Sequence, residues 1–175
     1  GMFAHNALPM SMSGGGQTER VLGELVSGNF FSVLGVNPHL GRVFTEMDDQ
    51  TPGAHPVAVI SYNFWQRRFG GDPNLIGKEI LLNDQKFTVV GVAAAGFQLL
   101  GKDVGLWIPA TLSRSDLTDR GSSYLTVIAR LKAGVTPQQA QADIDTIYQR
   151  IARDHPKFAE GLGAYALPLR EQLAG

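Results

Sequence analysis

The chain has 175 residues, of which 43% are hydrophobic and 18% charged, a composition typical of a globular protein and not of a disordered one. Its 15 basic and 16 acidic residues give a formal net charge of −1, which leaves no overall field to attract nucleic acid. It has no cysteine, which excludes a disulfide framework, a thiolate nucleophile and a cysteine-ligated zinc ion.

The first third of the chain predicts short strands and one short helix. Alternating apolar residues over 4–12 and 19–26, on either side of the glycine-rich stretch 13–18, predict a β-hairpin. The segment 29–36 predicts a short helix, and the apolar run 56–61 predicts a strand.

The stretch 61–71, SYNFWQRRFGG, raises a functional question, because aromatic residues interleaved with arginines can bind nucleic acid. A helix is expected over 62–69, because a capping serine precedes it and a glycine pair follows it. Trp65 and Phe69 are four residues apart and would share one face of this helix. Arg67 and Arg68 would point in other directions. We favour a structural interpretation, an aromatic anchor whose rim the arginines cover, because no wider basic groove surrounds it.

Further along, a second hairpin and a linker are expected. Residues 78–83 and 86–94 flank the turn residues Asn83-Asp84-Gln85 and predict two antiparallel strands. The segment 103–112 predicts one more strand, and the polar stretch 113–123 predicts a linker between two parts.

The C-terminal third has the clearest pattern. Residues 124–131 alternate as a strand, and Thr136-Pro137-Gln138-Gln139 combines an N-cap, a first-turn proline and a capping-box glutamine. A helix is therefore expected over 136–154. Its apolar residues recur at helical spacing and form one stripe: Ala140, Ile144, Ile147, Tyr148 and Ile151. A final strand over 164–169 would complete a β-α-β unit. The mixture of elements without strict alternation predicts the α+β class.

The motifs that could carry chemistry are all weak. The run 161–166, GLGAYA, resembles a dinucleotide-binding motif, but the predicted order is helix then strand, the reverse of what that motif needs. The acids Glu46, Asp48 and Asp49 lack the spacing of a calcium loop. A solvated turn, in which an aspartate caps a short helix, explains them better.

The histidines give no metal-ligand pattern either, since His5, His39, His55 and His155 are scattered along the chain. No nucleophile-elbow serine and no P-loop is present. We therefore predict no catalytic, cofactor-binding or metal-binding residues, and we predict that the chain is not an enzyme.

Five stretches, in this order along the chain, carry a resemblance to a known family: VSGNFFSVLGVNPHLGRVFTEMDD, PVAVISYNFWQRRFGGDPNLIGKEILLNDQKFTVVGV, GFQLLGKDVGLWIPA, YLTVIARLKAGVTPQQAQADI and LPLREQLAG. Together they resemble the MacB-like periplasmic domain of FtsX-type permeases of ABC transporters, and most closely the large orphan permeases of acidobacteria and related bacteria. The resemblance covers roughly residues 19–175. It rests on the order of the set, because no single motif decides it.

The resemblance implies an organisation and a location. A discontinuous porter-like part would comprise residues 1–28 and 123–175, with an inserted β-rich, sabre-like part over 29–122. Transmembrane helices outside this sequence would anchor the domain on the periplasmic side of the inner membrane. An ABC ATPase on the cytoplasmic side and a periplasmic protein would be its partners, with no nucleic acid and no cofactor.

Two features depart from the family pattern. The opening strand and helix of the family would precede Gly1, so the porter-like part would be incomplete in this sequence. The second hairpin has Asn83-Asp84 where relatives often have Asn-Gly. Because aspartate adopts a left-handed conformation less readily than glycine, a longer or looser turn is expected there.

Three functions compete at this point. The resemblance implies a non-catalytic module that transmits conformational change or contacts partners for export, with core anchors at Phe30, Phe31, Trp65, Phe69 and Trp107. A small-molecule or peptide binding module of the same transporter would instead need a concave pocket on the order of several hundred Å³ with convergent polar groups. A stand-alone hydrolase would need one of the two aspartates of the acidic turn within hydrogen-bond reach of a histidine, in a cleft.

Overall fold

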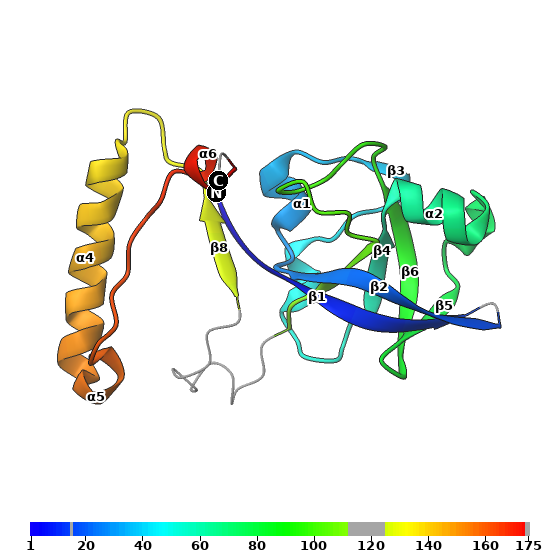
Figure 1. The fold of residues 1–175 in the computed structure, drawn as a ribbon, viewed down its shortest axis with the longest axis horizontal. Coiled ribbons are helices and arrows are strands. Elements are labelled where there is room, and N and C mark those ends of the chain that lie inside the picture. Colours follow the sequence, from blue (N-terminus) through cyan, green and yellow to red (C-terminus); the bar gives the residue numbers. More distant parts are fainter. Residues whose placement is uncertain (15, 112–124, 174–175) are drawn as a thin grey trace.

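The computed structural model describes residues 1–14, 16–111 and 125–173 and has an α+β fold (Figure 1). The strands are β1 (Met2–Gly14), β2 (Gln17–Val26), β3 (Pro38–Gly41), β4 (Val57–Ile60), β5 (Glu79–Leu82), β6 (Gln85–Ala93), β7 (Leu106–Pro109) and β8 (Thr126–Ala129). The helices are α1 (Phe30–Leu34), α2 (Tyr62–Phe69), α4 (Pro137–Asp154), α5 (Pro156–Ala159) and α6 (Leu169–Leu173), with short 3-10 turns η1 (Glu46–Asp49) and η2 (Pro73–Leu75).

Six of the strands close into a ring. β1 pairs with β2 along one edge and with β5 along the other. β2 pairs in parallel with β7, and β7 pairs antiparallel with β4. β4 pairs in parallel with β6, and β6 pairs antiparallel with β5, which returns to β1. β3 adds to β6, and β8 adds to the first residues of β1. We call residues 1–111, as far as the structure describes them, the β-rich body, and residues 125–173 the C-terminal part.

The two faces of the strands supply two hydrophobic cores. In β4, Ala58 and Ile60 join the first core, whereas Val57 and Val59 join the second. This alternation follows from the period of two in a strand, whose successive side chains point to opposite faces. Aromatic side chains complete each core: Phe64 and Trp65 of α2 in the first, and Phe30, Phe31, Phe44 and Trp107 in the second.

Local sequence signals set the bounds of α2. The Ser61 side chain accepts a hydrogen bond from the Phe64 amide at 3.2 Å, and Gly70 ends the helix with φ 61°. The predicted cap, helix and stop are thus confirmed. Of the five predicted core anchors, four are buried, and only Phe69 is partly exposed.

The turn between β5 and β6 is tighter than expected. Asn83 and Asp84 both have positive φ, 48° and 65°, and the ladder closes directly with Leu82 opposite Gln85. The expectation of a longer or looser turn was therefore wrong. The physical reason lies in β1. The backbone amide of Ser11 donates to the side-chain oxygen of Asn83 at 3.0 Å, and the backbone carbonyl of Ser11 accepts from the backbone amide of Asn83 at 2.8 Å. These two bonds hold the first turn residue in the left-handed conformation.

The C-terminal part confirms the helix but not the last strand. Thr136 and Gln139 form the predicted capping box at the start of α4. Residues 164–169 do not form a strand, and α6 begins at Leu169. No strand among the described residues lies beside this segment, and the Gln141 side-chain amide instead bonds to the Ala164 carbonyl at 3.1 Å and the Ala166 amide at 2.7 Å. The predicted linker, 113–123, lies outside the described residues.

Candidate functional site

β1 joins the β-rich body to the C-terminal part. Its first residues, Met2–His5, pair with Thr126–Ala129 of β8, and its remaining length pairs with β2. His5 belongs to both ladders, because it lies opposite Thr126 in β8 and opposite Val26 in β2. Figure 1 shows β8 beside the start of β1, with α4 and α5 farther from the β-rich body. The junction between the two parts is therefore a ladder of four residue pairs.

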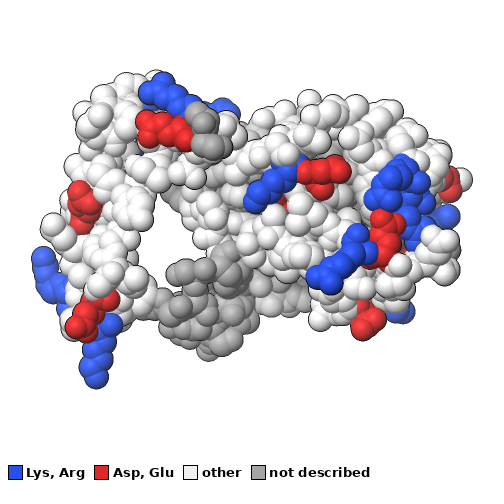
Figure 2. Space-filling view, viewed as in Figure 1, with Lys and Arg blue, Asp and Glu red and all other residues white. Residues whose placement is uncertain are grey.

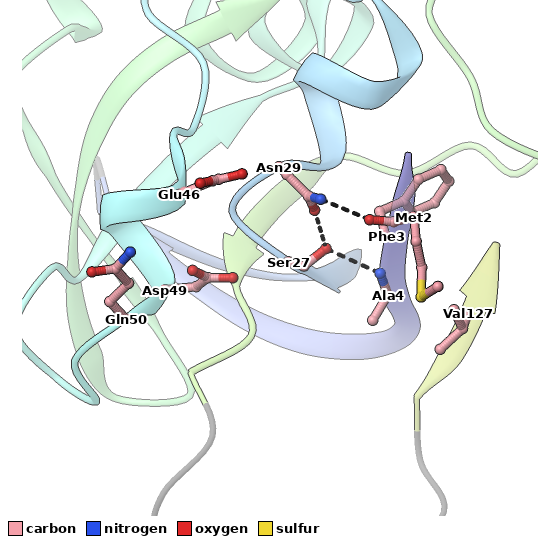
Figure 3. Close-up of a pocket in the computed structure, with 9 residues that line it drawn as sticks. All are labelled: Met2, Phe3, Ala4, Ser27, Asn29, Glu46, Asp49, Gln50 and Val127. Carbon is pink, nitrogen blue, oxygen red and sulfur yellow. Dashed lines mark hydrogen bonds between the residues drawn. The ribbon is translucent and has the colours of Figure 1, made fainter. Parts of the chain in front are cut away.

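Side chains continue the ladder where β2 ends. The Ser27 hydroxyl accepts from the Ala4 amide at 3.0 Å, and the Asn29 side-chain amide donates to the Met2 carbonyl at 2.7 Å (Figure 3). The Ser27 hydroxyl in turn donates to the Asn29 side-chain oxygen at 2.8 Å. The first residues of β1 are thus held on both edges, by β8 on one and by two polar side chains on the other.

A cavity of about 410 Å³ opens at this junction. Figure 3 shows apolar residues of β1 and β8 on one side of it and the acidic turn η1 on the other. Its lining comes from both parts of the chain: Met2, Phe3, Ala4, Ser27, Asn29, Glu46, Asp49, Gln50 and Val127. One side of the cavity is therefore acidic and the other apolar.

A buried polar network lies close to the same junction. The Glu24 carboxyl group lies 2.6 Å from Nδ1 of His5 and accepts from the indole nitrogen of Trp107 at 3.1 Å. All three side chains are buried, and none of them lines the cavity. The sequence analysis missed this network. Its signal was available, because Glu24 stands in a strand between Leu22 and Val26, two apolar residues of the same face.

The acidic turn is only partly what the sequence predicted. Thr45 rather than an aspartate is the N-cap of η1, and Asp48 completes the capping box, because its side chain accepts from the Thr45 amide at 2.8 Å. Asp48 is buried rather than solvated, and Arg42 binds both its oxygens at 2.8 and 3.1 Å. Burial opposes ionisation of Asp48, but hydrogen bonds from Arg42 and the Thr45 backbone outweigh it and hold the pKa of Asp48 below its ordinary value. Asp49 accepts from the Gly28 amide at 2.6 Å. These bonds go to an arginine and to backbone groups rather than to a histidine, so they give the hydrolase hypothesis no support.

The arginines of α2 hold the β1–β2 hairpin. Arg67 and Arg68 both bind Glu19 of β2, at 2.9 and 3.2 Å. Arg68 also donates to backbone carbonyls at the hairpin end, and each arginine lies over an aromatic ring of α2. With Trp65 buried and the arginines paired, the stretch serves packing, in agreement with the structural interpretation.

The C-terminal part presents an apolar surface. No residue of α4 is buried: in its predicted apolar stripe, Ile147 is exposed and the other four residues are half-buried. Among the described residues, the exposed large apolar side chains other than Met2 and Met47 all lie in this part: Val127, Leu131, Ile147, Leu162, Tyr165, Leu167, Leu169 and Leu173. Figure 2 shows few charged residues over the inner side of this part, the side that faces the rest of the molecule.

The family model described as the MacB-like periplasmic core domain matches residues 4–147, which is most of the chain. The chain belongs to this family. A MacB-like periplasmic core domain lies on the extracytoplasmic side of a membrane protein. The resemblance found in the sequence is thereby confirmed, and only the narrower likeness to acidobacterial orphan permeases remains a prediction.

Curated relatives agree with this membership. The macrolide export ATP-binding/permease protein MacB of Burkholderia thailandensis is 35% identical over 126 residues, which are 69% of this chain and 19% of that protein. The protein of the same name from Salmonella typhi is 28% identical over 124 residues, 68% of this chain and 18% of that protein. The chain thus spans about a fifth of the length of the curated relatives it matches.

Solved structures share the fold. The periplasmic region of MacB from Actinobacillus actinomycetemcomitans matches with a TM-score of 0.66 at 16% identity, over 93% of this chain and 77% of that one. The extracellular domain of the noncanonic ABC-type transporter YknZ from Gram-positive bacteria matches with a TM-score of 0.63 at 16% identity, over 89% of this chain and 75% of that one.

Two further properties concern only the part of the chain that the structure describes. None of its helices has both the length and the apolarity needed to cross a bilayer. Within the same residues, no three or more histidine, aspartate and glutamate side chains come together as a metal site would require.

Proposed function

We propose that this MacB-like domain is a non-catalytic module of an FtsX-type permease that transmits conformational change, or contacts partners, during export. The observation that carries the proposal is the contrast between its two parts. The β-rich body has two complete cores, whereas the C-terminal part buries no residue of its main helix and joins the body through a four-residue ladder. A well-packed body beside a thinly attached part is the arrangement expected where relative movement is functional.

The remaining elements of the proposal follow the family. The domain would stand on the periplasmic side of the inner membrane, with transmembrane helices outside this sequence, an ABC ATPase on the cytoplasmic side and a periplasmic partner protein. The family also implies a division into a porter-like part, residues 1–28 and 123–175, and a sabre-like insertion, 29–122. In this division, β1 and β2 would belong to the porter-like part although they pair with strands of the β-rich body. We propose no catalytic, cofactor-binding or nucleic-acid-binding role.

We propose that the apolar stripe of α4 contacts the rest of the transporter. Four residues of the stripe are half-buried and Ile147 is exposed, and further exposed apolar side chains of the C-terminal part accompany it. Exposed apolar side chains gathered in one part of a domain are typical of an interaction site, because water contact with them is unfavourable. The chain spans only about a fifth of its curated relatives, so most of a whole transporter lies outside it.

A labelling experiment tests this contact. The chain has no cysteine, so each introduced cysteine is the one label site in the 175 residues, and any cysteine elsewhere in the full-length permease is removed first. Ile147→Cys lies on the α4 stripe with 54% of its surface exposed, and the control Met47→Cys lies on the β-rich body with 62% exposed. Maleimide should modify both at similar rates in the 175-residue chain. In the full-length permease, the cysteine at 147 should react at least about ten-fold more slowly, the effect of a buried position that opens only locally. Equal rates at the two positions in the full-length protein would contradict the proposal.

One observation favours a second candidate, a binding module of the same transporter. The cavity has the expected size, about 410 Å³, and it places the acids Glu46 and Asp49 opposite an apolar wall. Such a lining suits a small, partly apolar cation. Under this candidate, n-hexylamine would raise the melting temperature of the chain, n-hexanoate would not, and Glu46→Gln would reduce the effect. No response to the amine would remove this candidate.

A further inference from the structure

We infer that Ser27 and Asn29 form a releasable latch on the first residues of β1, with His5 and Glu24 as the fixed pivot about which the C-terminal part moves. This inference rests on the proposed function, because it names the point through which movement between the two parts would pass.

The latch acts on a short segment that lies between the two parts. Residues 2–4 of β1 carry β8 on one edge, so any displacement of β8 relative to the β-rich body must bend or shift them. On the other edge, their hydrogen bonds to the body are that of the Ser27 amide, which donates to the Ala4 carbonyl at 2.9 Å, and the two side-chain bonds of Ser27 and Asn29. The Phe3 ring is in addition buried in the second core, 5.0 Å from the ring of Phe30. Releasing the hydrogen bonds would loosen the segment around this ring without breaking its ladder to β8.

The bonds of the latch are suited to opening. The Asn29 bond to the Met2 carbonyl is exposed, and the Ser27 bond to the Ala4 amide is only partly buried. Water can replace a side-chain partner at such positions, because the backbone groups left behind are hydrated rather than orphaned. A continuous backbone ladder, such as the ten pairs between β1 and β2, offers no comparable point of release.

The pivot has the opposite character. The Glu24 carboxylate is buried, and its two oxygens are occupied by His5 and Trp107. Separating a buried carboxylate from its partners would leave a charge without compensation in an apolar core. The β1 backbone is therefore fixed at His5, and the buried Phe3 ring adds a second fixed point, so the C-terminal part turns about these two side chains.

The loop that carries the latch is anchored to the body. The Gly28 amide donates to Asp49 at 2.6 Å, and a Cβ at this position would clash with the Thr45 carbonyl oxygen. The loop thus lies directly against η1, which leaves the first residues of β1 and β8 as the elements that move. The cavity gives them room, because Met2, Ala4 and Val127 face η1 across it (Figure 3).

Distance measurements in the 175-residue chain test the latch. Spin labels on Met47→Cys of the β-rich body and Gln149→Cys of α4, both exposed positions, report the relation of the two parts by pulsed electron paramagnetic resonance. The Ser27→Ala/Asn29→Ala variant should shift the maximum of the distance distribution or widen it. Ser13→Ala is the matched control, because it loses a hydroxyl bond to Thr18 at the far end of the hairpin, and it should leave the distribution unchanged.

The outcomes separate cleanly. Identical distributions for the latch variant and the Ser13→Ala control would overturn the inference. If tryptophan fluorescence shows that the double variant has lost its folded body, the distance measurement is repeated with the single variant Asn29→Ala. The bond that this variant loses is exposed, so its loss should leave the body folded. An unchanged distribution in that variant would also overturn the inference. The measurement uses the 175-residue chain without the permease. The latch can therefore be contradicted while the proposed function stands, and the proposed function can be contradicted while the latch stands.

Discussion

Replacing Trp107 by alanine is expected to lower the free energy of unfolding by about 3–5 kcal/mol, the range for a large buried aromatic side chain. The indole is 1% exposed and packs against Phe31 and Phe97, with ring centroids 5.5 Å away in both cases. Its loss would leave a cavity in the second core. It would also take one of two hydrogen-bond partners from the buried Glu24 carboxylate.

Urea unfolding of the wild type and the Trp107→Ala variant measures this effect. Trp107→Phe separates the two contributions, because it keeps most of the ring volume but cannot donate to Glu24. It should lose about 1–3 kcal/mol, the cost of leaving a buried acceptor unsatisfied. If Trp107→Ala lost less than Trp107→Phe, the packing account of the second core would be wrong.

Trp65→Ala is expected to lose a similar amount, about 3–5 kcal/mol. The side chain is buried in the first core, lies 5.6 Å from the ring of Tyr62, and donates from its indole nitrogen to the Asp72 carbonyl at 3.0 Å. This bond ties α2 to the turn that follows it, so the variant removes both core volume and a link between elements.

The neighbouring Gln66→Ala is the control for Trp65→Ala. Gln66 is exposed on the same helix, and substitutions at such surface positions usually change stability by less than about 0.5 kcal/mol. A loss below about 1 kcal/mol for Trp65→Ala, with an unchanged urea dependence, would show that the indole is not a core anchor.

Elements with local signals could be predicted from the sequence. The caps of α2 and α4, the two hairpins and the strand β4 each follow from residues within one short window, and the structure confirms them. The family cannot be read from any one of these short windows. It was predicted from the ordered set of five stretches, and the family model confirms it. The α+β class likewise followed from the mixture of elements.

Features that depend on distant partners could not be predicted in the same way. Closure of the ring needs β1 to meet β5 and β2 to meet β7, pairings that no local pattern encodes. The alternation over 164–169 is strand-like, but a strand needs a neighbour to bond with, and the described residues provide only the side chain of Gln141. The burial of Asp48 similarly depends on Arg42, which the acidic pattern alone did not reveal.

The candidate site was the least predictable feature, because it is a junction rather than a motif. Ser27 and Asn29 are ordinary loop residues in the sequence, and their role emerges only when Met2 and Ala4 lie beside them. Glu24 is the exception. An acidic residue at the centre of an apolar strand face signals a buried charge, and a buried charge requires a partner.

The central claim, that the domain transmits movement between its two parts, is tested most directly in the full-length permease assembled with its ATPase. With spin labels on Met47→Cys and Gln149→Cys, and other cysteines removed, the distance distribution is compared without nucleotide and after trapping with ATP and orthovanadate. We predict that trapping shifts the distribution, because the β-rich body and α4 change their relation during the ATPase cycle. The same distribution in both states, in a preparation that hydrolyses ATP, would contradict the account.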